Sequence, residues 1–181
     1  MKATGIVRRI DDLGRVVVPK EIRRTLRIRE GDPLEIFTDR EGEIILKKYS
    51  PIGELGQFSQ QYADSLSQTT GLIVAISDKD QIVATAGGLK RELQEKAISP
   101  ELEKLIEERE IITAAKGDKN FVRIIDGELD YTYHVICPII SQGDAIGAVI
   151  ILTQDSKVKF GETQEQLAST AAAFLGVQME Q

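Results

Sequence analysis

Short apolar runs separated by polar turn residues dominate the first fifty residues and predict a small β-rich unit. These runs occupy residues 4–10, 15–18, 34–37 and 44–46. The segment Asp11-Asp12-Leu13-Gly14 predicts a tight turn between the first two runs, and Gly42 supplies the positive φ that a hairpin between the last two needs. Pro19 predicts the start of a short helix near residues 20–26, in a segment rich in arginine.

The spacing of apolar residues becomes helical after Ser50, which with Pro51 is typical of a helix start. The apolar stripe of this helix consists of Leu55, Phe58, Tyr62 and Leu66. Strand-like runs follow at 72–76, 81–84, 133–140 and 145–152, with helical segments within 89–110 and over 161–179. Residues 111–131 predict a mixture of loops and short strands. The pattern therefore indicates a second unit of helices and strands.

This change of pattern predicts a domain boundary near residues 49–53. We expect an N-terminal domain at 1–50, a linker at 51–55 and a C-terminal domain at 56–181, in an α+β protein. The 181 residues are 41% hydrophobic and 29% charged, which is typical of a soluble globular protein. No apolar run approaches the ~20 residues that span a bilayer, and the basic start lacks a signal-peptide core. We expect a cytoplasmic protein that has no membrane partner.

The charge of the chain is divided unevenly along its length. Residues 1–29 contain nine Lys or Arg and three Asp or Glu, a net charge of +6, whereas the whole chain carries −6. Everything after Arg29 therefore sums to −12. A basic end on an acidic protein is typical of a surface that binds a polyanion such as nucleic acid.

The N-terminal domain is too small to be stable as a single copy. A core of about fifty residues rarely supplies more than ~3–5 kcal/mol, and a helix of two turns is far below the ~12–15 residues that an isolated helix needs. Residues 1–50 contain no cysteine that could form a disulfide or a metal site. We therefore expect a dimer whose core is shared between two chains.

Four N-terminal segments, in their order and spacing, closely resemble the AbrB-type transition-state regulators. They are Thr4-Gly-Ile-Val-Arg8, Asp12-Leu-Gly-Arg-Val-Val-Val-Pro19, Glu21-Ile-Arg-Arg-Thr-Leu26 and Ile44-Ile-Leu-Lys-Lys-Tyr49. The resemblance implies an intertwined swapped-hairpin β-barrel dimer that binds DNA. The remainder is similar to a GAF domain, which implies an antiparallel sheet flanked by helices; residues 137–152 carry most of this likeness. Both halves together are similar to regulators of spore-forming bacteria.

The resemblance implies that Arg8, Arg15, Arg23 and Arg24 contact DNA. Secondary candidates are Lys2, Arg9, Lys20 and Arg27. Arginine suits this role because its rigid donor fork grips a phosphate or a guanine edge. Strand alternation alone leaves open which of Arg8 and Arg9 faces DNA. On the helix, Arg23 and Arg24 lie opposite Ile22 and Leu26, so both are expected to point outward.

No catalytic or metal site is expected anywhere in the chain. His134 is the only histidine and lies in an apolar run without a cluster of ligands at metal spacing, so we interpret it as structural. Cys137 is the only cysteine, and a free cysteine in an apolar strand commonly behaves as a small buried hydrophobe. A single thiol also excludes a reductase that needs an attacking and a resolving cysteine. We expect no cofactor. Whether an unidentified small-molecule effector binds near Arg123, Tyr131 and Tyr133 stays open.

The helices at both ends of the C-terminal domain predict a second interface between chains. The candidate oligomerisation residues are Leu55, Phe58, Tyr62, Leu66, Leu167, Ala171, Phe174 and Leu175. The last helix is rich in alanine and has apolar stripes on two sides, which permits close approach of another helix. The alternative is that both stripes pack only on their own sheet. Dimers at both ends of the chain would give a tetramer, a dimer of dimers.

The function that we expect is a non-enzymatic, DNA-binding transcriptional regulator of sporulation genes, both activator and repressor. Its partners are double-stranded DNA and further copies of itself. The resemblance implies a nucleoid-associated protein of the forespore. Two alternatives stay open. One is an antitoxin with the swapped-hairpin fold, and the other is a ligand-sensing GAF protein in which DNA binding is incidental.

Overall fold

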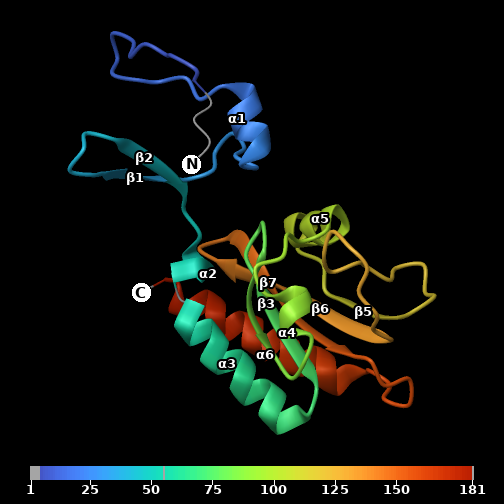
Figure 1. The fold of residues 1–181 in the computed structure, drawn as a ribbon. Helices are drawn as coiled ribbons and strands as arrows, with labels where there is room; N and C mark the ends of the chain where they lie inside the picture. The colour runs from blue at the N-terminus through green and yellow to red at the C-terminus, as the bar shows by residue number, and fades with distance from the viewer. Residues whose placement is uncertain (1–4, 55, 181) are drawn as a thin grey trace. The chain divides into compact units, whose positions relative to one another are not determined.

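A computed structural model describes residues 5–54 and 56–180 of the chain (Figure 1). The chain divides into two compact units, Met1–Tyr49 and Ser50–Gln181, and we describe each separately. The division lies within the expected boundary region. The expected linker at 51–55 differs from the structure, because Pro51–Glu54 forms helix α2 and its Ile52 is fully buried in the core of the second unit. Leu55 lies outside the described residues.

The N-terminal unit contains one helix and one hairpin. Helix α1 spans Lys20–Thr25, and strands β1 (Leu34–Thr38) and β2 (Ile44–Lys48) are antiparallel, with Leu34 opposite Lys48. The loop between the strands closes around Asp39, whose Oδ1 accepts the N–H groups of Glu41 and Glu43, each at 2.9 Å. The helix and the hairpin that the sequence predicts are therefore confirmed.

The two strands predicted at 4–10 and 15–18 are not formed in the single chain. Residues 5–10 and 15–18 are assigned to no strand, although the predicted turn between them is present. The turn is closed by the Asp11 and Gly14 N–H groups, which donate to the carbonyls of Arg15 and Asp11 at 3.0 Å each. Because a strand is defined by its ladder of hydrogen bonds to a neighbour, a segment without a neighbouring strand is not one, whatever its apolar pattern.

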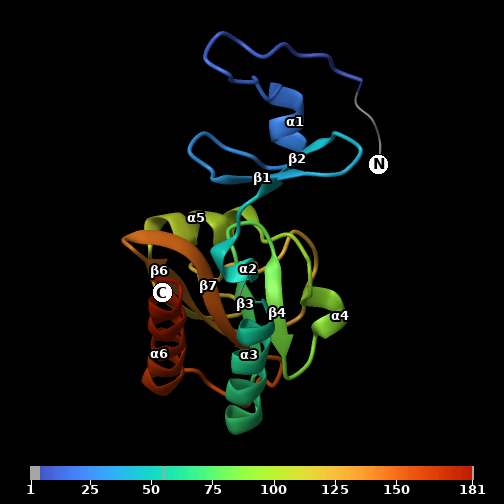
Figure 2. The same cartoon turned by 90° about the vertical axis from the view of Figure 1, so that its left-hand side faces the viewer.

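The second unit is a five-stranded antiparallel sheet covered by helices on both faces. Its strands are β3 (Ile73–Ser77), β4 (Ile82–Ala86), β5 (Ile112–Ala115), β6 (Tyr133–Ser141) and β7 (Asp144–Thr153), in the order β4-β3-β7-β6-β5. Its longer helices are α3 (Gly56–Thr70), α5 (Pro100–Glu108) and α6 (Glu162–Gln178), and α4 (Lys90–Leu93) is a single turn. Helices α3 and α6 lie side by side along one face, and α5 lies on the other (Figures 1 and 2).

Each face of the sheet contributes to a separate apolar core. Strand residues that alternate along β3, such as Val74 and Ala75, belong to different cores because successive side chains point to opposite faces. The first core lies beneath α3 and α6, and the second contains Leu102 and Ile106 of α5. The predicted strands and helices of this unit are confirmed, including the α5 start, where the Ser99 hydroxyl accepts the Leu102 N–H at 3.0 Å.

Helix α6 packs unusually close to the sheet. Its buried residues are Ala168, Ala171, Ala172, Leu175 and Gly176. A methyl group added to Gly176 would lie 2.1 Å from the carbonyl oxygen of Ile140 on β6, so the backbones of helix and strand nearly touch there. The alanine-rich stripe of α6 therefore packs on its own sheet.

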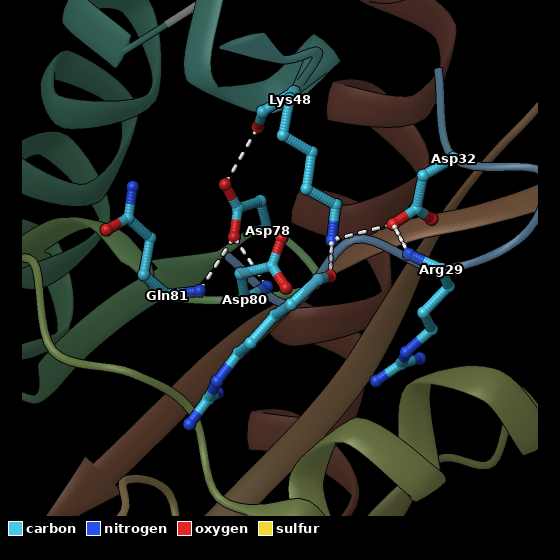
Figure 3. Close-up of polar contacts among 8 residues, drawn as sticks. Arg29, Asp32, Lys48, Asp78, Asp80 and Gln81 are labelled. Carbon is cyan, nitrogen blue, oxygen red and sulfur yellow. Dashed lines mark hydrogen bonds and ion pairs between the residues drawn. The ribbon is translucent and has the colours of Figure 1, made fainter. Parts of the chain in front are cut away.

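A polar cluster stabilises the loop after β3. The Asp78 carboxylate accepts the backbone N–H groups of Asp80 and Gln81, each at 2.7 Å, and its other oxygen accepts the Ser50 hydroxyl at 2.8 Å (Figure 3). The Ser50 hydroxyl oxygen in turn accepts the Gly53 N–H at 3.0 Å, which caps helix α2. Ser50 therefore begins the helix that the sequence predicts and also fixes it to the β3–β4 turn.

Candidate nucleic-acid interface

Helix α1 presents two of the predicted DNA contacts to solvent. Pro19 precedes the helix and its carbonyl accepts the Arg23 N–H at 3.0 Å, so the first turn is closed without a side-chain cap. Ile22 is half-buried and marks the inner side of the helix, whereas Arg23 and Arg24 are exposed. Arg23 and Arg24 are therefore accessible on α1 in the single chain.

Arg15 is displayed on the turn at residues 11–14. Asp11 Oδ1 accepts the N–H groups of Leu13 and Arg15, and Asp11 Oδ2 pairs with the Arg15 guanidinium at 2.9 Å. The Arg15 N–H holds the pKa of the Asp11 carboxyl below its usual value. Because the ion pair is exposed, it stabilises the turn weakly and leaves the guanidinium able to exchange Asp11 for a phosphate.

The other basic candidates are distributed around these positions. Arg8 and Arg9 are both exposed on the segment 5–10, so the structure of the single chain leaves open which of them faces DNA. Lys20 is exposed at the start of α1, and Lys2 lies outside the described residues. Arg27 is exposed beyond the end of α1 and has a left-handed backbone with φ = +52°.

Apolar side chains that would normally be buried are exposed throughout the N-terminal unit. Val7 is 89% exposed and Ile36 is 70% exposed. The other exposed apolar residues of this unit are Ile6, Ile10, Leu13, Val16, Val17, Leu26, Phe37, Ile44 and Leu46. Soluble proteins rarely expose an apolar surface of this extent on one small unit.

Sequence reasoning missed a group of polar contacts at the end of α1. Lys48 Nζ donates to the Arg27 carbonyl at 3.0 Å and pairs with Asp32 at 3.1 Å, and Asp32 accepts the Arg29 N–H at 2.8 Å (Figure 3). The only hint in the sequence is that no glycine directly follows α1, so the helix end needs another residue in the left-handed conformation. Nothing in the spacing of Lys48, 21 residues from Arg27, indicates this contact.

The candidate oligomerisation residues occupy two different environments. Ala171 and Leu175 are fully buried in the first core of the second unit, so they cannot present a surface to another chain. Phe58, Tyr62, Leu66 and Leu167 are half-buried, and Phe174 is 42% exposed. Val177, which is not among these candidates, is 55% exposed one turn after Phe174. The exposed apolar surface of α3 and α6 thus consists of their partly covered aromatic residues and Val177.

His134 and Cys137 are placed in the interior of the second unit. His134 is fully buried, and its Nε2 accepts the Val122 N–H at 3.0 Å. Burial lowers the pKa of the His134 imidazole to about 4, so the ring is neutral at physiological pH. Burial also raises the pKa of the Cys137 thiol, which keeps it protonated and unreactive.

An open cavity of about 810 Å³ lies along residues 116–131 of the second unit. Arg123 and Tyr131 line it, as do Phe121 and Asp126, but Tyr133 does not. The Arg123 guanidinium is paired with Glu101.

Two family models match the chain. One, described as the stage V sporulation protein T C-terminal transcription factor family, matches residues 54–180. The other, described as the antidote-toxin recognition MazE bacterial antitoxin family, matches residues 7–54. Stage V sporulation protein T of Bacillus subtilis strain 168 is 52% identical over 182 residues, which cover 100% of both chains.

The chain belongs to the stage V sporulation protein T family. It is a transcriptional regulator of sporulation and not an enzyme, as the sequence predicts. The transition state regulatory protein AbrB of the same organism is 47% identical over 85 residues, which cover 46% of this chain and 88% of AbrB. The AbrB-type resemblance of the N-terminal segments is therefore confirmed.

Solved structures confirm the fold expected for the C-terminal part of this family member. The GAF domain of an Acinetobacter phosphoenolpyruvate-protein phosphotransferase matches 74% of the chain and 84% of its own length, with a TM-score of 0.57 and 14% identity. A methyl-accepting chemotaxis protein domain matches 70% of the chain and 91% of its own length, with a TM-score of 0.57 and 18% identity. Within residues 5–54 and 56–180, no helix is long and apolar enough to cross a bilayer.

Proposed function

We propose that this regulator binds double-stranded DNA through the basic surface of its N-terminal unit. The observation that carries the proposal is the exposure of Arg15, Arg23 and Arg24 in a segment of net charge +6, on a chain of net charge −6. The role of a transcription factor requires a surface for DNA, and the acidic remainder of the chain repels phosphates. Arg8, or Arg9 beside it, completes the proposed contact set on the adjoining extended segment.

The DNA-binding form is proposed to be a dimer built from two N-terminal units. Residues 5–10 and 15–18, where the sequence predicts strands at 4–10 and 15–18, pair with no strand in one chain, and their apolar side chains are exposed. Pairing with the same segments of a second chain would satisfy these backbone groups and bury both apolar faces. An intertwined hairpin barrel of two chains meets both needs.

The second unit is proposed to join two such dimers into a tetramer. Phe174 of α6 lies between two rings of α3, with centroids 5.9 Å from Phe58 and 5.4 Å from Tyr62. These rings and Val177 form an apolar strip on the helical face of the unit. A like strip from a second copy would cover it, which would fix the spacing between two DNA-binding ends.

We further propose that the regulator is a cytoplasmic, nucleoid-associated protein of the forespore.

The test is a titration of DNA with a variant that lacks all four arginines. Replacing Arg8, Arg15, Arg23 and Arg24 by alanine should abolish retardation of DNA in a gel-shift assay and flatten the log–log salt dependence by ~0.9 for each lost phosphate contact. The control variant removes four exposed lysines of the second unit, namely Lys79, Lys90, Lys104 and Lys157. It has the same net charge and should bind as the parent does. Equal binding by both variants would refute the proposed surface.

An antitoxin is the second candidate, because the MazE antitoxin model matches residues 7–54. An antitoxin would need a segment that binds a toxin. This chain instead continues after Glu54 within a folded unit that matches the transcription factor family. Co-expression with the products of neighbouring genes would separate the candidates. Rescue of growth from a toxic neighbour would favour the antitoxin.

A further inference from the structure

The C-terminal end of α1 has an unusual residue at its left-handed position. Ile28 N–H donates to the Arg23 carbonyl at 2.7 Å and Arg27 N–H donates to the Arg24 carbonyl at 3.3 Å, which is the hydrogen-bond pattern of a Schellman closure. Arg27 occupies the position where glycine is the common residue, with φ = +52°. A side chain at this φ is strained, so the conformation requires support from the surrounding structure.

The support comes from the open end of the β1–β2 hairpin, opposite its loop. Lys48, the last residue of β2, donates from Nζ to the carbonyl of the strained Arg27. Its ammonium group is also 3.1 Å from the Asp32 carboxylate. The two side chains are 21% and 16% exposed, so solvent screens this ion pair less than it screens the Arg15–Asp11 pair.

Asp32 extends this support into the loop between α1 and β1. Its carboxylate accepts the Arg29 N–H at 2.8 Å, and its own N–H donates to the Arg29 carbonyl at 3.3 Å, so one residue closes the loop from both sides. Burial opposes the ionisation of Asp32, but the Arg29 N–H and the Lys48 ammonium outweigh it and lower the pKa of the carboxyl. The carboxylate is therefore ionised at physiological pH and pairs with Lys48.

We propose that Lys48 and Asp32 are positioning residues for DNA recognition. The Lys48–Asp32 pair holds the backbone of Arg27 and Arg29, and with it the end of α1, in the conformation that presents the candidate Arg27 to DNA. This proposal rests on the proposed DNA-binding surface and adds two residues that do not themselves contact DNA. Arg27 and Arg29 would otherwise belong to a short flexible loop, and ordering them beforehand lowers the entropy lost on binding.

The sign of the effect of Asp32→Asn separates positioning from simple electrostatics. Removing a negative charge beside a basic surface strengthens DNA binding if charge alone matters. If the Lys48–Asp32 pair positions the loop, the same change weakens specific binding. Asparagine keeps an oxygen that can accept the Arg29 N–H, so the variant removes the ion pair while leaving the loop closure available.

The experiment uses the full-length protein and two duplexes of equal length. One is the duplex that the parent protein selects from a random-sequence pool, and the other is a shuffled version of it. Asp32→Asn should lower affinity for the selected duplex about tenfold, the scale of one misplaced base contact. Affinity for the shuffled duplex should stay the same or rise. Higher affinity for the selected duplex, or no change, would overturn the proposal.

Lys48→Met tests the other half of the pair, with Lys47→Met as its matched control. Both substitutions remove one positive charge from β2, but Lys47 is exposed and lies over the Phe37 ring at 5.0 Å, away from the pair. Lys48→Met should lower selected-duplex affinity about tenfold more than Lys47→Met does. Adding Asp32→Asn to Lys48→Met should cause little further loss, whereas independent roles would give additive losses. Equal effects of the two lysine variants would overturn the proposal even if Asp32→Asn did not fold.

Hydrogen exchange supplies a readout that does not depend on DNA. The Arg29 amide should exchange faster in Lys48→Met than in the parent, while the Arg23 amide, which donates to Pro19, should keep its protection. Equal exchange at Arg29 would argue against a positioning role. Failure of the DNA-binding surface itself would be recognised separately, because the parent protein would then select no duplex at all.

Discussion

Phe174 of α6 stacks on Tyr62 of α3, with ring centroids 5.4 Å apart and ring planes inclined by 22°, although 42% of the Phe174 side chain is exposed. The two helices thus meet through aromatic rings that are only partly covered. Burial of the remaining surface in another copy would add apolar contact area without any rearrangement of the core. A substitution of Phe174 can therefore test the assembly of the protein without unfolding its core.

Phe174→Glu should convert a tetramer into dimers. A charge in the centre of an apolar interface is costly, whereas the exposed edge of Phe174 allows the variant to fold. Affinity for DNA with two suitably spaced sites should fall by about 10²-fold or more, because linkage between two binding ends is lost, while affinity for a single site stays constant. Analytical ultracentrifugation and gel-shift titration measure the two effects.

The control for this variant is Thr163→Glu, which adds the same charge at an exposed position near the start of α6. It should leave the tetramer and both affinities intact. An equal loss of single-site and two-site affinity in Phe174→Glu would show that α6 stabilises the fold and does not set the spacing.

A fragment that ends at Ser50 should form a dimer. Its exposed apolar residues, among them Val7 and Ile36, have no cover within one chain, and a unit of this size cannot stay folded with that surface in water. Sedimentation equilibrium should therefore give twice the fragment mass. A folded monomer by circular dichroism and sedimentation would contradict the shared core.

Arg27→Gly should give a more stable protein than Arg27→Ala. Both changes remove the same guanidinium, but only glycine adopts φ = +52° without strain, so the two variants should differ by about 1 kcal/mol in the free energy of unfolding. Urea denaturation of the two variants measures the difference. A more stable alanine variant would mean that the left-handed backbone is not retained in solution.

Stability should rise with pH between about 4 and 6.5 because of His134. Burial lowers the pKa of its imidazole to about 4 in the folded protein, against about 6.5 when unfolded. The unfolded state binds more protons in that window, so the free energy of unfolding falls as the pH drops, by about 3 kcal/mol in total. Urea denaturation over this pH range measures the slope.

His134→Gln is the matched variant for this prediction, because glutamine keeps an oxygen that can accept the Val122 N–H but does not titrate. Its stability should depend less steeply on pH than that of the parent. Parallel curves for the two proteins would show that His134 is not the group responsible.

Local sequence signals predicted most of the elements. Pro19 marks the start of α1, Ser99 caps α5, and Gly42 accompanies the turn between β1 and β2. These signals work because each acts on backbone groups within a few residues of itself. The sequence also shows directly that positive charge is concentrated at the N-terminal end, since a net charge of +6 in 29 residues depends on composition and not on packing.

The side of a helix that is buried was predicted less well. The sequence placed Ala171, Phe174 and Leu175 in one set, but Ala171 and Leu175 face the sheet while Phe174 lies at the edge of the core. Residues three or four apart on a broad apolar helix differ by only tens of degrees around its axis, so the position of the sheet decides which of them meets solvent. The close approach at Gly176 shows that this position is set by the packing of α6 on β6.

What the sequence determined by itself is therefore the order of the elements, the division into a basic and an acidic part, and the set of exposed arginines on α1. Only the tertiary structure decided that the Lys48 side chain reaches the Arg27 carbonyl and the Asp32 carboxylate, because contacts between residues 21 and 16 positions apart depend on how the chain returns on itself. The tertiary structure also decided that the apolar segments 5–10 and 15–18 form no strand in one chain, because a strand exists only through hydrogen bonds to a neighbouring strand.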